Sequence, residues 1–218
     1  VLATHLQEVV RQHAGELLTR DATRHLLDEL KKSSPAVVEE LIPGTMKLGE
    51  VQQVLQMLLN EAVSIRQLGI ILETLADYAG KTKDPIWLVE YVRHRLARTI
   101  CTQYRDEQDR VYVVTLDPAL EDRISAGIEH TERGLFIRMS PQAIDVTCDQ
   151  VFAELENLVQ AGHRPVVLVS PQIRPGFRQL ISAKLPKVVV LSYNEMTRDT
   201  QIESVGMVSD VMPEMVGS

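Results

Sequence analysis

The chain has 218 residues, and its 30 Asp and Glu residues against 23 Lys and Arg residues give a formal net charge of -7 at pH 7. This acidic balance excludes a protein that binds nucleic acid through a basic surface. Hydrophobic residues make up 44% of the chain and charged residues 24%, which excludes an intrinsically disordered protein. At about 100–200 residues per domain, we expect two small domains.

The first part of the chain predicts helices, because apolar residues recur at three- and four-residue spacing. Asp21 is a typical helix N-cap, and Pro43-Gly44 is a typical helix end. Two strongly amphipathic helices are expected between Glu50 and Leu75. The sequence therefore predicts a helical subdomain over residues 1–83.

A change of pattern marks the second part of the chain. Asp84-Pro85 supplies an N-cap and a first-turn proline for a long linking helix that is expected to reach Ile100. The run Val111–Leu116 is β-branched and aromatic, which favours a strand. We expect an α/β subdomain over residues 84–205, led by the linking helix.

Two further apolar runs, Pro165–Val169 and Val188–Leu191, flank a helical pattern and predict two parallel neighbouring strands. Leu135–Ile137 and Gln201–Val208 are expected to form edge strands. The predicted fold class is α+β, with a helical subdomain followed by a small α/β subdomain whose sheet is mixed and partly parallel. Residues 206–218 are expected to form a partly disordered tail.

No motif in the sequence indicates catalysis or cofactor binding. A glycine-rich phosphate loop, an HExxH pair and a GxSxG turn are all absent. Cys101 and Cys148 stand outside any CxxC motif and are interpreted as small buried apolar residues. We therefore predict no catalytic residue, no cofactor and no metal site.

Arg174, Phe177 and Arg178 are the candidate partner-binding residues. They belong to the loop and helix start Ser170–Arg178, where a helix N-terminus and two cations suit an anion or an acidic partner segment. The alternative interpretation is a solvated helix end with Phe177 buried.

Several segments carry a resemblance to a known family: Val1–Leu6, Leu48–Glu61, Ser64–Leu68, Ile71–Ala79, Pro165–Pro175, Leu191–Glu195 and Val205–Gly206. They resemble, in collinear order, the helical part and the C-terminal α/β subdomain of the FlhA family. This family is the large export-gate subunit of flagellar and injectisome type III secretion.

The resemblance implies the cytoplasmic part of a bacterial inner-membrane protein whose preceding segments cross the membrane. The start at Val1, without an initiator Met, is expected of such a fragment. The family implies a nonameric ring that receives export substrates, their chaperones and the stalk protein of the export ATPase. It implies no enzymatic activity and no nucleic-acid partner.

Two segments, Ser192–Glu195 and Glu203–Gly206, favour a flagellar over an injectisome protein. The alternatives are an injectisome homologue and a small-molecule-binding enzyme that uses the carboxyl ends of the parallel strands.

Overall fold

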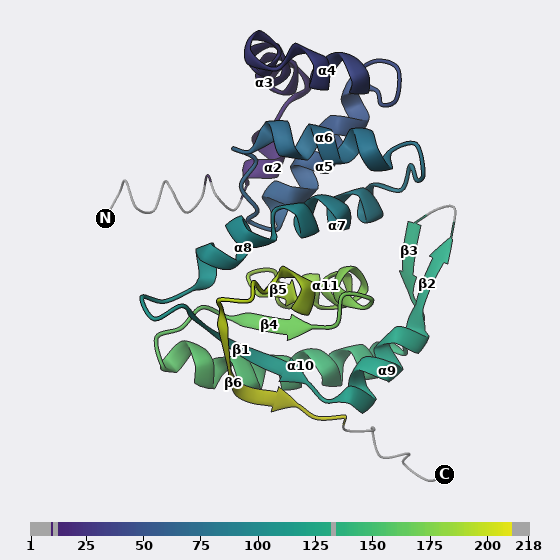
Figure 1. Cartoon of the computed structure of the whole chain (residues 1–218). Coiled ribbons are helices and arrows are strands. Elements are labelled where there is room, and N and C mark those ends of the chain that lie inside the picture. Colours follow the sequence, from purple (N-terminus) through teal and green to yellow (C-terminus); the bar gives the residue numbers. More distant parts are fainter. Residues whose placement is uncertain (1–9, 11–12, 132–133, 211–218) are drawn as a thin grey trace. The chain divides into compact units, whose positions relative to one another are not determined.

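The computed structural model describes Val10 and residues 13–131 and 134–210. The chain forms two compact units, which divide between Leu96 and Ala97 (Figure 1). The first unit is helical, and the second combines a sheet with helices. This composition confirms the α+β fold class.

The helical unit is built from helices joined by short connections. In chain order these helices are α2 (Ala14–Leu17), α3 (Arg20–Ser33), α4 (Pro35–Leu41), α5 (Leu48–Asn60), α6 (Leu68–Tyr78) and α7 (Pro85–Arg95).

Helices α5 and α6 carry the apolar stripes that the sequence predicted between Glu50 and Leu75. The stripes are buried because their members recur at helical spacing and all face the interior of the unit. The fully buried members are Val51, Val54, Leu55, Leu58, Ile71, Leu72 and Leu75.

The expected linking helix is two helices in the structure. Helix α7 ends at Arg95, and α8 (Ala97–Tyr104) begins after a one-residue interruption at Leu96. Helix α7 packs against α5 and α6, and Tyr91 stacks on Tyr78 with ring centroids 4.0 Å apart. These contacts place α7 in the helical unit, so the two units divide at Leu96 and not at the expected position after residue 83.

The α/β unit begins with α8 and alternates strands with helices. In chain order its further elements are β1 (Arg110–Leu116), α9 (Pro118–Gly127), β2 (Ile128–Thr131), β3 (Gly134–Ile137), α10 (Pro141–Gln160), β4 (Val166–Val169), α11 (Arg174–Ser182), β5 (Val189–Ser192), η1 (Tyr193–Glu195) and β6 (Gln201–Val208).

Four strands form a parallel sheet in the order β5-β4-β1-β6. The predicted parallel pairing of β4 with β5 is confirmed, with Val167 opposite Val190. Apolar residues from every strand of this sheet join residues of α9, α10 and α11 in one buried cluster, which includes Val114, Val151 and Phe177. The three helices thus pack on the sheet through one continuous core.

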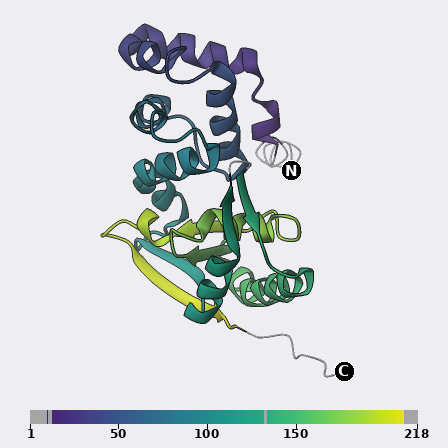
Figure 2. The ribbon, with the colours of Figure 1, turned by 90° about the vertical axis from the view of Figure 1, so that its right-hand side faces the viewer.

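Strands β2 and β3 form a separate antiparallel pair, with Ile128 opposite Ile137 (Figure 2). The sequence predicted one mixed sheet with Leu135–Ile137 at its edge. In the structure the antiparallel pairing is confined to this hairpin, because Leu135 and its neighbours pair with β2 alone among the described strands.

The predicted strand Gln201–Val208 is confirmed as β6. Residues 206–208 therefore belong to the sheet and not to the tail, since Gly206 pairs with Val114 and the buried Val208 pairs with Leu116. The rest of the predicted tail, from residue 211 onward, lies outside the described residues.

Arg105 ties the start of the α/β unit to the loop that precedes β6. Its Nη1 lies 2.8 Å from Asp109 Oδ1, and its Nη2 lies 2.9 Å from Asp199 Oδ1 and also donates to Thr197. The hydrogen bonds from Arg105 and Thr197 hold the pKa of Asp199 well below its usual range. The charged form of Asp199 is therefore favoured by folding.

This depressed pKa predicts a pH-dependent contribution to stability. Its sign is fixed: the contribution is present above the unfolded pKa of about 3.9, and it is lost as the pH falls through the lower folded pKa. We expect Asp199→Asn to lower Tm at pH 7, and the difference from the unaltered protein to narrow below about pH 4. Thermal melts across pH test this. Glu156→Gln, at an exposed carboxylate of α10, should leave Tm unchanged at every pH.

Candidate partner surface

The predicted partner-binding residues lie at the start of α11, just after the carboxyl end of β4. Glu121 of α9 holds the loop between β4 and α11. Its Oε1 accepts a hydrogen bond from the Ser170 N–H at 2.9 Å, and its Oε2 accepts one from the Ser170 hydroxyl. Burial and the negative charge of Glu121 raise the pKa of the Tyr193 hydroxyl nearby. The carboxylate of Glu121 therefore already accepts hydrogen bonds from Ser170, in the loop where the sequence suggested that an anion or an acidic segment could bind.

Two of the three candidate side chains are buried in the structure. Phe177 is 0% exposed and belongs to the core of the α/β unit, as the alternative interpretation held, and Arg174 is 1% exposed. Arg178 is half-buried, and its Nη2 donates to the Pro186 carbonyl oxygen at 3.1 Å. Of the three, only Arg178 keeps part of its side chain exposed, and its contact with a partner stays a prediction.

The hairpin of β2 and β3 explains part of this burial. A Cβ on Gly176 would lie 2.7 Å from Ile128 Cγ1 and 3.4 Å from Ile137 Cδ1, so the hairpin lies directly against α11. Gln179 Nε2 also donates to the Leu135 carbonyl oxygen at 3.3 Å. The absence of a side chain at Gly176 permits this close approach. The position of the hairpin depends on contacts distant in sequence, so no local pattern signals that α11 is covered.

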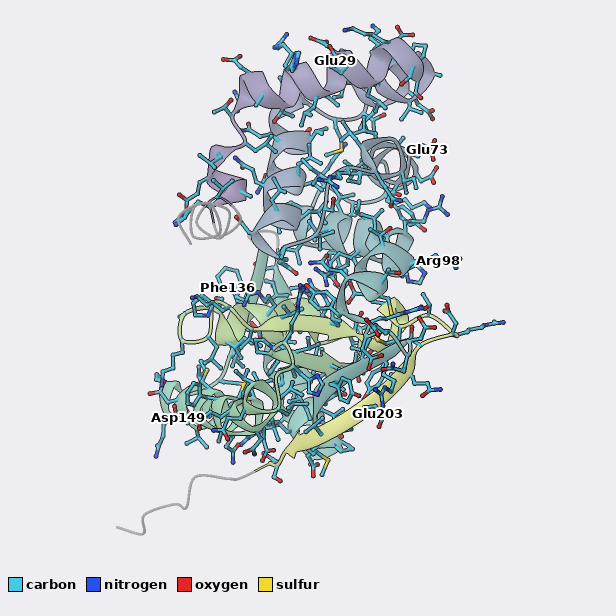
Figure 3. All side chains as sticks on the ribbon, turned by 90° about the vertical axis from the view of Figure 1, so that its left-hand side faces the viewer. Glu29, Glu73, Arg98, Phe136, Asp149 and Glu203 are labelled. Carbon is cyan, nitrogen blue, oxygen red and sulfur yellow. The ribbon has the colours of Figure 1, made fainter. Side chains whose placement is uncertain are left out.

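Apolar side chains lie exposed elsewhere on the α/β unit, at positions that sequence reasoning missed. Phe152 and Val159 are half-exposed on α10, seven residues and therefore about two helical turns apart. Phe136 is half-exposed on β3, and Figure 3 labels it. Strand β6 carries a third exposed set. The exposure of β6 follows from its place at the edge of the sheet, and the sequence alone does not give the strand order.

The described residues contain no group of three or more His, Cys, Asp and Glu side chains placed to hold a metal ion. None of the described helices has the length and apolar character needed to cross a membrane. Cys101 and Cys148 are free thiols and both are buried, which confirms their interpretation as small interior residues.

Residues 1–201 match the model of the FHIPEP family. The flagellar biosynthesis protein FlhA of Bacillus subtilis is 39% identical over 95% of this chain and 31% of its own length. The low calcium response locus protein D of Yersinia pestis is 30% identical over 95% of this chain and 29% of its own length. The chain thus spans about a third of the length of these curated relatives.

Solved structures agree with this match. The Chlamydia pneumoniae CdsV protein has a TM-score of 0.86 at 28% identity, over 95% of this chain and 59% of CdsV. The structure of the CdsV and CdsO complex has a TM-score of 0.85 at 26% identity, over 95% of this chain and 59% of the matched chain. Nonameric EPEC SctV-C has a TM-score of 0.81 at 30% identity, over 93% of this chain and 61% of the SctV-C chain. The resemblance seen in the sequence is confirmed, and the chain belongs to the FHIPEP family, which includes the flagellar biosynthesis protein FlhA.

Proposed function

We propose that this chain is the cytoplasmic, ring-forming part of a flagellar protein-export gate at the inner membrane. The observation that carries the proposal is the family match over residues 1–201, which runs through both units in one collinear stretch. The family belongs to the flagellar and type III secretion apparatus, a transport system, and it is not a family of enzymes.

Flagellar export is favoured over injectisome export by the pattern of identities. Identity reaches 39% with a flagellar relative and 30% with the low calcium response protein, over the same share of this chain. In the bacterium that carries this protein, we expect deletion of its gene to abolish flagellar filaments and swimming. Reintroducing the unaltered gene is the control. If the deletion strain swims normally but no longer secretes proteins through an injectisome, the flagellar assignment fails and the injectisome alternative holds.

Assembly into a nonameric ring is the second element of the proposal. SctV-C is nonameric, and the EscV cytosolic domain, at a TM-score of 0.78, is nonameric as well. We expect light scattering over a concentration series to detect large closed assemblies for this chain extended upstream to the length of those structures. An extended protein that stays monomeric at every concentration would remove the ring from the proposal.

Partner recognition is the third element. The complex of CdsV with CdsO supports a role in binding other proteins of the apparatus. We propose that the helical unit contributes ring contacts, and that the α/β unit faces neighbouring subunits or the stalk protein of the export ATPase. Pull-down of the stalk protein by the assembled ring, compared with the isolated chain, tests this assignment.

A further inference from the structure

Strand β6 is the outer strand of the four-stranded sheet, and β1 is the only described strand that pairs with it (Figure 1). Residues 201–205 are exposed on both faces of the sheet. The exposed apolar side chains are Ile202 at 40%, Val205 at 46% and Met207 at 49%. Natural proteins usually protect such an edge, because its backbone groups are a template for another strand.

The hydrogen bonds at the two ends of β6 fix which of its backbone groups point outward. The Gln201 N–H donates to the Asp109 carbonyl oxygen at 2.9 Å, and the Val208 carbonyl oxygen accepts from the Asp117 N–H at 2.9 Å. Gln201 and Val208 therefore direct their backbone groups toward β1. The register of the pair shifts by one residue between Ser204 and Gly206, which lets both ends of β6 point toward β1. Successive residues alternate on either side of this shift, so the N–H and C=O groups of Ile202 and Met207 point away from β1.

Two carboxylates flank this edge. Glu203 lies on β6 in register with Tyr112, and Figure 3 labels it at the surface. Glu154 of α10 lies directly over Gly206, at the position that a side chain there would need. Within the described part of the chain, neither carboxylate has a hydrogen bond or an ion pair. The edge therefore combines open backbone groups, apolar side chains and uncompensated negative charge.

We propose that β6 binds an extended segment of a partner protein, in which apolar residues alternate with Lys or Arg, as a fifth strand of the sheet. Outward backbone groups would pair with the segment, and its cations would meet Glu203 and Glu154. Charge complementarity selects this occupant over a second copy of the chain, since two copies would bring two acidic edges together. The inference rests on the geometry of the α/β unit and not on the proposed function.

The test uses a fluorescein-labelled eight-residue peptide of alternating Lys and Val, with anisotropy measured on the whole chain. We expect Ile202→Pro to weaken binding by about fivefold or more, because it removes one outward N–H donor. Ile202→Ala is the matched control, since it shortens the same side chain but keeps the N–H. Equal losses in the two variants would overturn strand addition. Amide exchange at Glu203 verifies that β6 still pairs with β1 in both variants.

A second pair of variants tests the charges without altering the backbone. Glu154→Gln with Glu203→Gln should weaken binding of the Lys-Val peptide several-fold. Glu107→Gln with Glu156→Gln removes the same charge from exposed positions elsewhere and should leave binding unchanged. If both pairs of variants weaken peptide binding equally, the peptide is attracted by the net negative charge of the protein and not by Glu154 and Glu203. That result would overturn the proposal.

Two other occupants would give different results. Concentration-dependent dimers that Ile202→Pro abolishes would assign the edge to a second copy of the chain. A large gain in peptide affinity on removing residues 211–218 would assign it to that segment. Either result overturns the proposal of a partner segment.

Discussion

Replacing Phe177 with alanine is expected to lower the free energy of unfolding of the α/β unit by about 3–5 kcal/mol. Phe177 is fully buried in the cluster that joins the sheet to its helices, so the substitution leaves a cavity that its neighbours fill only in part. A loss of this size approaches the total stability of many small domains. Urea denaturation of the variant and of the unaltered protein, fitted with one shared slope m, measures the difference in free energy of unfolding.

Two controls separate packing from partner binding. Phe177→Leu keeps most of the buried volume and should cost less than about 1.5 kcal/mol. Phe152→Ala truncates the same residue type at a half-exposed position of α10 and should cost within about 0.5 kcal/mol. The opposite result, a Phe177→Ala protein of normal stability that fails to bind a partner, would return Phe177 to the partner surface.

The second large effect is expected at the ion pair between α7 and the end of α5. Arg93 Nη1 lies 2.8 Å from Glu61 Oε2, and the side chains are only 3% and 17% exposed. Removing Glu61 leaves the buried Arg93 guanidinium without the carboxylate that its Nη1 contacts. Glu61→Ala should therefore lower the free energy of unfolding of the helical unit by about 3 kcal/mol.

Removing both charges should be much less harmful. In the double variant Glu61→Met with Arg93→Met, apolar side chains replace both partners, and we expect it to be more stable than Glu61→Ala alone. A double-mutant cycle in urea gives the coupling between the two residues. A coupling free energy near zero would show that other contacts stabilise the buried Arg93 side chain and that the ion pair contributes little to stability.

Local patterns predicted most elements of this fold. The stripes of α5 and α6 and the β-branched runs of β1, β4 and β5 lie where the sequence placed them, because burial follows directly from their spacing. The interruption at Leu96 gave no such signal. Neither Gly nor Pro stands there, although α7 ends at Arg95 and α8 begins at Ala97.

The surface was harder to predict than the interior. The sequence places Arg174 and Phe177 at a helix N-terminus with two cations, a pattern that suits an acidic partner segment. The hairpin Ile128–Ile137 covers that start, and its position depends on contacts distant in sequence, such as that of Gly176 with Ile128. The free edge of β6 likewise follows from strand order, which single-sequence patterns do not encode.

The sheet order also has a consequence for folding during synthesis. Strand β1 pairs with β6 across a sequence separation of about 90 residues, as the contact between Thr115 and Gly206 shows. The ribosome must therefore release residue 208 before the sheet of the α/β unit can be completed, whereas the contacts within the helical unit end at Leu96. We expect the helical unit to fold first on the nascent chain, and the α/β unit to remain incomplete and open to chaperones until β6 emerges.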